Sequence, residues 1–135
     1  MTPDYDVAQV LHAAGLGLTY GTNLFTGPIR AAQGPVPLAA TFCVALGGSP
    51  PEGYLNNGAA TPELFSPLVR VIIRGSSQAH ATELTLGRGV IAALHGKPPS
   101  TYISCRSRQS QPEPYGEDDD GAFLFGMDFD LLKDE

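Results

Sequence analysis

Three histidines and one acidic run are the residues best suited to catalytic chemistry. His12, His80 and His95 lie on predicted helices or at their ends, with no acidic residue at a metal-ligand spacing. A group of histidine, aspartate and serine could meet in the fold, but a chain of 135 residues permits that without a chemical role. The pattern therefore favours surface or helix-capping roles for the histidines over catalysis.

The acidic run is Glu117 followed by Asp118, Asp119 and Asp120. Its carboxylates could bind a divalent cation, but they lack the alternating ligand spacing of a calcium loop. A solvated turn is therefore favoured. The segment Gly15-Leu16-Gly17 follows a predicted helix, whereas a nucleotide-binding glycine loop stands between a strand and a helix. The sequence predicts no cofactor and no metal, and we expect the protein not to be an enzyme.

The two cysteines, Cys43 and Cys105, lie in apolar segments that resemble strands. Neither has a second cysteine or a histidine at a metal-ligand spacing. A disulfide between adjacent strands is one alternative. Two buried, reduced thiols with a structural role are favoured.

Basic residues concentrate in two pairs, each on a predicted strand, and two aspartates lie on a third strand. The arginines are Arg70, Arg74, Arg106 and Arg108, and the aspartates are Asp128 and Asp130. Arginine and aspartate on neighbouring strands could pair across the sheet or across a subunit interface. The alternative is an ordinary solvated sheet face.

Length and charge exclude several classes of protein. A chain of 135 residues fits a single domain. The net charge of −6 argues against tight binding to DNA or to an anionic membrane, because phosphate contacts require clustered lysine and arginine. No apolar run approaches the roughly 20 residues that cross a bilayer. The N-terminus shows no secretion signal.

The first half of the chain predicts a helix, a short edge strand and a central strand. Thr2 suits the N-cap, Pro3 the first helical position, and Gly15 the end of that helix. Its apolar stripe is Val7, Val10, Leu11 and Ala14. An edge strand is expected before Gly27-Pro28. Residues 38–46 then predict a strand covered on both faces, which ends in Gly47-Gly48-Ser49-Pro50-Pro51.

Residues 47–62 have no periodicity and predict a long loop with a binding role, or a surface excursion. Its isolated residues Tyr54, Leu55 and Asn56 are candidate interface residues. Residues 68–74 predict a strand with Val69, Val71 and Ile73 inward.

A second helix begins after Ser76 or Ser77 and ends at His95-Gly96. Its apolar positions are Ala79, Leu86, Val90, Ile91 and Leu94. Gly87 and Gly89 weaken this helix by roughly 1 kcal/mol each relative to alanine, or permit close packing on the sheet.

Residues 100–132 predict two strands joined by an acidic turn. The first strand places Ile103 and Cys105 inward, with Arg106 and Arg108 outward. Pro112, Pro114 and residues 116–121 form the turn. The second strand alternates with a period of two and gathers Phe123, Phe125, Met127, Phe129 and Leu131 on one face. The fold class is therefore α+β: a mixed or antiparallel sheet of about four to five strands, with two helices on one face and a C-terminal hairpin.

The order of these elements and several short strings resemble the minor capsid and tail-terminator proteins of long-tailed bacteriophages. The strings are Gly21-Thr22-Asn23-Leu24-Phe25, Gly47-Gly48-Ser49-Pro50-Pro51, Val69-Arg70-Val71-Ile72-Ile73-Arg74, Leu94-His95-Gly96 and Tyr102-Ile103-Ser104. Arg106, Gln109, Ser110, Pro114, Gly116 and the acidic turn complete the set. The glycines of the second helix and the triple aspartate depart from the expected pattern.

The resemblance implies a structural virion protein that forms one tail-terminator-like domain over residues 1–135. Such proteins form a homohexameric ring on the tail tube protein, stop tube polymerisation and dock to a head-completion, stopper or connector protein. The implied location is the tail and neck of the virion, with assembly in the host cytoplasm and no membrane partner. DNA passes through the lumen without specific binding.

The acids expected at the lumen or a loop tip are Glu117, Asp118, Asp119, Asp120, Asp128 and Asp130. A head-completion or stopper protein of the neck is the nearest alternative. A small hydrolase and a monomeric binding module remain as alternatives from other classes.

Overall fold

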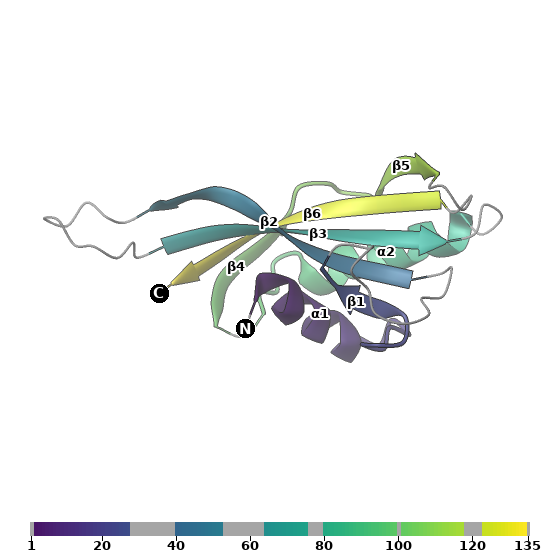
Figure 1. Ribbon diagram of the computed structural model, residues 1–135, viewed down its shortest axis with the longest axis horizontal. Coiled ribbons are helices and arrows are strands. Elements are labelled where there is room, and N and C mark those ends of the chain that lie inside the picture. Colours follow the sequence, from purple (N-terminus) through teal and green to yellow (C-terminus); the bar gives the residue numbers. More distant parts are fainter. Residues whose placement is uncertain are drawn as a thin grey trace, which may run out of the picture.

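The computed structural model describes residues 2–27, 40–52, 64–75, 80–99, 101–117 and 123–134. These residues form an α+β fold of two helices and six strands (Figure 1). In chain order the elements are α1 (Pro3–Ala13), β1 (Leu24–Thr26), β2 (Ala40–Glu52), β3 (Leu64–Gly75), α2 (His80–Leu94), β4 (Tyr102–Ser107), β5 (Glu113–Glu117) and β6 (Phe123–Asp134).

The strands form one mixed sheet in the order β1-β2-β3-β6-β4, with β5 also paired to β6. Only β1 and β2 run parallel, and the other described pairs are antiparallel. Because β3 pairs along one edge of β6, β4 and β5 share its other edge. There β5 lies beside Phe123 to Gly126, and β4 lies beside Phe129 to Lys133.

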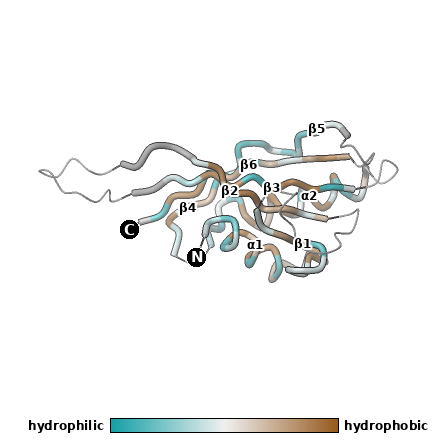
Figure 2. The backbone as a smooth tube through the Cα atoms, in the orientation of Figure 1, coloured by the Kyte–Doolittle hydropathy of each residue, from teal (hydrophilic) through white to brown (hydrophobic). Residues whose placement is uncertain are grey.

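Both helices pack on the same face of this sheet. Residues of α1 and α2 join the inward residues of β3 and β6 in one buried cluster. That cluster contains Val7, Ala8 and Leu11 of α1, Val90 and Leu94 of α2, Val69, Val71 and Ile73 of β3, and Met127, Phe129 and Leu131 of β6. Hydrophobic colour follows the central parts of the strands, whereas both helices carry hydrophobic and hydrophilic colour, as amphipathic helices do (Figure 2). The predicted inward faces of β3 and β6 are confirmed.

The first helix matches its sequence signals except at its cap and at one position of its buried stripe. Pro3 occupies the first helical position, and Gly15 follows the helix with a left-handed φ of +74°, which glycine adopts without strain. Thr2 stands at the N-cap, but its side chain makes no capping hydrogen bond. Ala8, rather than the predicted Ala14, completes the buried stripe.

Gly87 and Gly89 permit close packing of α2. A Cβ atom at Gly87 would lie 2.2 Å from Cγ of Pro112, and one at Gly89 would lie 2.8 Å from Cδ2 of Leu16. Glycine therefore lets the helix approach both neighbours, at the expense of helix propensity.

The central strand is longer than predicted. It is buried on both faces from Ala40 to Cys43, but Val44 and Leu46 are half-buried and Ala45 is exposed, so the expected cover holds only for the first part of the strand. It does not end at Gly47, because β2 continues to Glu52 alongside β3, with register shifts between Leu46 and Ser49 and between Ser49 and Glu52. Bulges of this kind let a ladder continue through glycine and proline. The predicted loop residues Tyr54, Leu55 and Asn56 lie outside the described residues.

The C-terminal region is not a simple hairpin. Residues predicted as a turn form β5. This strand tolerates Pro114 because it is short, pairs only with β6 among the described strands and shifts register between Pro114 and Gly116. Asp118, Asp119 and Asp120 lie outside the described residues.

Ile103 is 53 % exposed, so its predicted inward position was wrong. A register shift between Tyr102 and Ser104 displaces it and gives Tyr102 a buried position, while Cys105 points inward as predicted.

Candidate assembly surface on the outer face of the sheet

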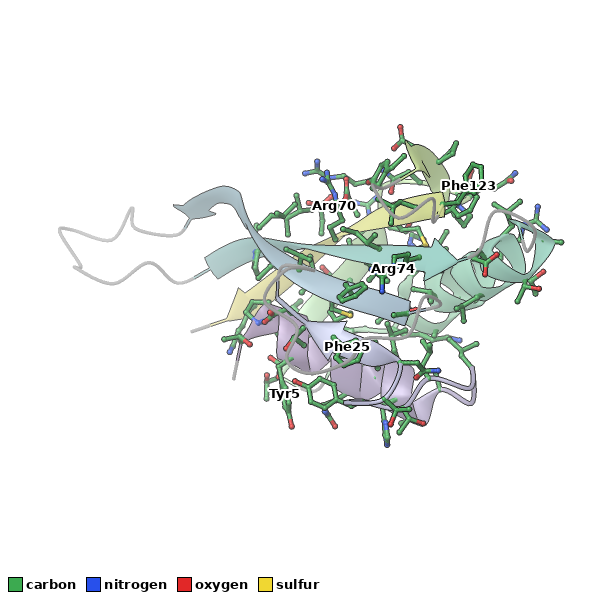
Figure 3. All side chains as sticks on the ribbon, turned by 45° about the vertical axis from the view of Figure 1, so that its right-hand side comes forward. Tyr5, Phe25, Arg70, Arg74 and Phe123 are labelled. Atoms are coloured by element: carbon green, nitrogen blue, oxygen red, sulfur yellow. The ribbon has the colours of Figure 1, made fainter. Side chains whose placement is uncertain are left out.

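The face of the sheet opposite the helices, here called the outer face, carries the predicted arginines and aspartates. Val69, Val71 and Ile73 point toward the helices, so Arg70 and Arg74 of β3 point the other way (Figure 3). By the same alternation, Asp128 and Asp130 of β6 lie on the outer face. The structure therefore brings these groups together on one surface.

Arg70 and Asp128 form a bidentate ion pair across β3 and β6. The two residues are directly opposite in the antiparallel register. Arg70 Nε lies 2.7 Å from Oδ1 of Asp128, and Nη2 lies 3.3 Å from Oδ2. Asp128 is only 7 % exposed, and its hydrogen bond to Arg70 raises the pKa of the guanidinium. This pair neutralises a buried carboxylate within the chain.

Arg108 and Asp130 form a second bidentate pair in a more exposed position. Arg108 Nε lies 2.8 Å from Oδ2 of Asp130, and Nη2 lies 3.0 Å from Oδ1. The hydrogen bond to Asp130 raises the pKa of Arg108. The side chains are 48 % and 38 % exposed, so this pair contributes less to stability than the first.

The other two arginines have different surroundings. The Arg74 guanidinium carbon lies 5.6 Å from the ring centroid of Phe42. Phe42 is itself fully buried and stacks on Phe25, with 5.6 Å between ring centroids. Arg106 is exposed and makes no hydrogen bond or ion pair with any described residue. Arg70 and Arg108 thus each pair with an aspartate across the sheet.

The sequence did not predict the contacts of Gln109 and Tyr115, which join the segment after β4 to β6. Gln109 Oε1 accepts the backbone N–H of Asp128 at 2.8 Å. The Tyr115 ring covers Gly126, where a Cβ atom would lie 2.2 Å from Cε2 of the tyrosine. The Arg70 guanidinium lies 5.5 Å from the Tyr115 ring centroid. The signal that could have revealed Tyr115 is Gly126, which leaves a vacant position between larger residues of a strand.

Two of the histidines accept hydrogen bonds from the backbone. His12 Nδ1 accepts the N–H of Tyr20 at 3.1 Å, and His95 Nδ1 accepts the N–H of Ser107 at 3.0 Å. Beside it, the N–H of Gly96 donates to the carbonyl of Cys105 at 2.8 Å, so the α2 terminus covers part of the β4 edge. Both imidazoles are exposed and lie at or near the C-terminal end of a helix. The side chain of His80 lies outside the described residues.

The two cysteines are free and buried, as predicted. Strands β3 and β6 stand between the strands that carry them. Burial raises the pKa of Cys43. Burial, and to a lesser extent the negative charge of Asp130, raises the pKa of Cys105 to about 12. Both thiols therefore remain protonated at neutral pH, which opposes nucleophilic chemistry and metal binding.

Potential metal ligands do not cluster in the described part of the chain: no group of three histidine, cysteine, aspartate or glutamate side chains is close enough to hold an ion. Glu83 of α2 is buried against Gly75, and its Oε2 lacks a hydrogen-bond partner among the described residues. Glu83 is therefore not part of a group of metal-ligating side chains among the described residues.

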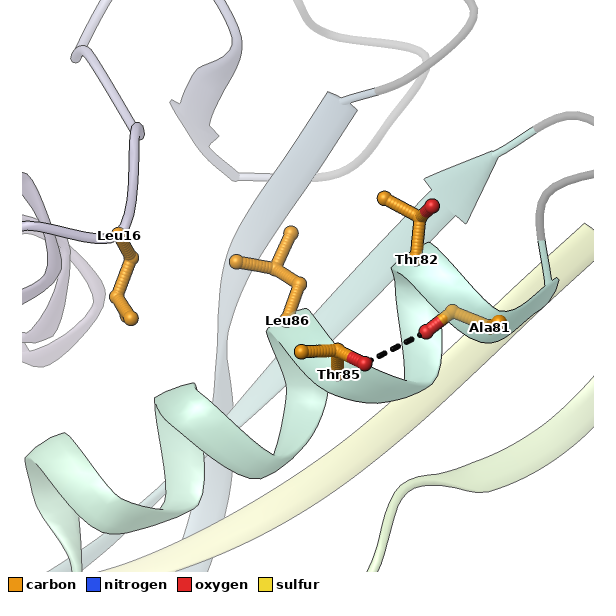
Figure 4. A pocket seen from close by; sticks show the side chains of 5 residues that line it. All are labelled: Leu16, Ala81, Thr82, Thr85 and Leu86. Carbon is orange, nitrogen blue, oxygen red and sulfur yellow. Dashed lines mark hydrogen bonds between the residues drawn. The ribbon is translucent and has the colours of Figure 1, made fainter.

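Open hollows lie on the described surface. One lies between α2 and the segment after α1 and is lined by Leu16, Ala81, Thr82, Thr85 and Leu86 (Figure 4). The Thr85 hydroxyl is already engaged, because it donates to the carbonyl of Ala81 at 2.8 Å. A second hollow borders Ile91, His95 and residues 107–110. A third is lined by Ser66, Arg106, Ser107, Arg108 and Asp130.

Comparison with known proteins found no matching family model and no similar curated protein. Among the described helices, none is long and apolar enough to span a membrane.

Proposed function

We propose that this protein is a structural subunit of a bacteriophage virion. In this proposal it is a tail terminator, which forms a ring on the end of the tail tube, stops tube polymerisation and joins the tail to the head. The supporting observation is the order of elements: an N-terminal helix, an edge strand, a long central strand, a second strand and helix, and paired C-terminal strands. The same order accompanies the short strings that resemble this family.

The local strings fall on the corresponding elements, with one difference. Leu94-His95-Gly96 ends α2, and Val69 to Arg74 lies within β3. The string Gly47-Gly48-Ser49-Pro50-Pro51 lies inside β2 rather than at its end. The proposal therefore places this string in an extended arm of the sheet instead of a loop.

A ring requires a heterologous interface, in which two different surfaces of the subunit meet and the rotation closes. In a sheet that helices cover on one face only, the outer face and the edge strands can supply such surfaces. The net charge of −6 also suits a lumen through which DNA moves without binding. Because Asp128 is buried and paired with Arg70, and Asp130 with Arg108, the proposed lumen acids are Glu117, Asp118, Asp119 and Asp120.

Deleting the gene from the phage or prophage that carries it tests this proposal. The lysate is examined by negative-stain electron microscopy, with the gene restored on a plasmid as the control. Overlong tails beside DNA-filled heads are the expected result. Free tails of normal length beside leaking or empty heads would instead place the protein on the head side, as a stopper. Intact virions in normal numbers would contradict any structural role.

A further inference from the structure

Arg106 differs from the other arginines of the outer face. Arg70 and Arg108 each have a bidentate aspartate partner, and Arg74 lies over Phe42. Arg106 has no hydrogen-bond or ion-pair partner among the described residues, and its side chain is exposed. Its five N–H donors are therefore available to a ligand from outside the subunit.

Arg106 also lines a hollow whose described residues carry more positive than negative charge. In the register of β4 and β6 it stands directly opposite Asp130, but both carboxylate oxygens of Asp130 bind Arg108, at 2.8 and 3.0 Å. Among the described residues, the hollow is therefore lined by two guanidinium groups and one carboxylate, together with Ser66 and Ser107. One more carboxylate would balance its charge and could bind Arg106 in a bidentate manner.

We propose that this hollow binds a carboxylate side chain from a second copy of this chain. The proposal rests on the proposed function, in which copies of the subunit meet in a ring. Each copy has 14 acidic and eight basic residues, so two approaching copies repel one another unless a cation stands at the contact. Arg106 is such a cation, placed on the face that the helices leave open.

The charges favour a protein carboxylate over nucleic acid. Asp130 lies in the same hollow, and the chain as a whole is acidic, so a DNA backbone would approach against a negative field. A single carboxylate contacts Arg106 without bringing a row of further negative charges to the surface. A second copy of an acidic chain supplies that group.

The test measures self-association of the purified full chain by analytical ultracentrifugation, comparing wild type with Arg106→Gln, Arg106→Lys and Arg88→Gln. Arg88 is an exposed arginine of α2 without an ion pair among the described residues, so its variant controls for the loss of one positive charge. We expect Arg106→Gln to weaken self-association at least about tenfold. Arg106→Lys should fall between it and wild type, because lysine lacks the bidentate geometry. Arg88→Gln should match wild type.

Other outcomes would overturn the inference. The proposed contact would be contradicted if the wild-type protein stays monomeric at all concentrations. It would also be contradicted if the Arg106→Gln variant associates as strongly as wild type. Loss of binding to a double-stranded DNA oligonucleotide with unchanged self-association would assign Arg106 to nucleic acid instead. Thermal unfolding of each variant shows whether it is folded. These results are separate from the tail phenotype of the gene deletion, so failure of the contact and failure of the proposed function can be told apart.

Discussion

The side chain of Gln109 accepts the backbone hydrogen bond of Asp128 that a neighbouring strand would otherwise accept. On this edge β6 is paired to β5 as far as Gly126 and to β4 from Phe129 onward, which leaves a gap between them. In that gap Gln109 Oε1 accepts the N–H of Asp128 at 2.8 Å, and the N–H of Arg108 donates to the carbonyl of Asp128 at 2.8 Å. The Gln109 side chain thus bonds β6 between the end of its pairing with β5 and the start of its pairing with β4, beside the partly buried Arg70–Asp128 ion pair.

Replacing Gln109 with leucine should destabilise the protein. The substitution leaves the partly buried N–H of Asp128 without an acceptor, which costs about 1–3 kcal/mol. Urea unfolding measures the change in the free energy of unfolding. Gln111→Leu is the matched control, because Gln111 is exposed two residues further along. Equal effects of the two substitutions would show that the bond to Asp128 contributes nothing.

The two ion pairs should differ in their contributions to stability. Arg70→Met leaves the buried Asp128 carboxylate without its cation and should cost about 2 kcal/mol, less than a fully buried pair because the Arg70 side chain is 38 % exposed. Adding Asp128→Asn should recover part of that loss, since the uncompensated charge is then gone. Arg108→Met should produce no measurable change in urea unfolding. A larger loss at Arg108 than at Arg70 would reverse the assignment.

Alkaline pH should weaken the fold through Tyr102. Burial, and then its hydrogen bond to Asp6 at 2.8 Å, raise the pKa of Tyr102 above its ordinary value of 10.0. The folded chain therefore holds this proton more tightly than the unfolded chain does. Its contribution to stability is complete below pH 10 and declines above it, as the unfolded phenol ionises first.

Tyr102→Phe separates this effect from the rest of the protein. At pH 7 the variant should be less stable by about 1 kcal/mol, because the hydrogen bond to Asp6 is lost. Above pH 10 its stability should decline less steeply than that of wild type. Urea unfolding at a series of pH values gives both slopes. Parallel slopes would show that Tyr102 does not carry the alkaline dependence.

The two glycines of α2 should respond differently to alanine. Helix propensity alone favours alanine at each by about 1 kcal/mol. At Gly87 the new methyl group would meet the rigid ring of Pro112 at 2.2 Å, so we expect a net loss of about 1–2 kcal/mol. At Gly89 it would meet a flexible leucine side chain, Leu16, at 2.8 Å, so the loss should be smaller. Thermal unfolding of both variants compares them, and a more stable Gly87→Ala protein would contradict the packing.

Local sequence determined the directions of many side chains. The period of two in residues 68–74 and 123–131 placed Val71 and Met127 in the core and Arg70 and Asp128 on the opposite face. The helix that begins at Pro3, and the end of the second helix before Gly96, also followed from local signals. These features depend on dihedral preferences and on the alternation of side chains along one segment, which neighbouring residues in the chain are enough to set.

Only the tertiary structure decided which segments pair and in what register. Strand β2 continues past Gly47 and Pro50 because β3 pairs with it beyond these residues. The residues around Pro114 form a strand because they pair with β6. The tertiary structure turned Ile103 outward through a one-residue shift against β6. It also decided that Asp128 forms its ion pair with Arg70 and Asp130 with Arg108. Arg106 has no ion-pair partner among the described residues. Such choices depend on hydrogen bonds between residues far apart in the chain. The alternation within one segment shows which face of a strand is buried, but it does not name the partner strand or the residues that stand opposite.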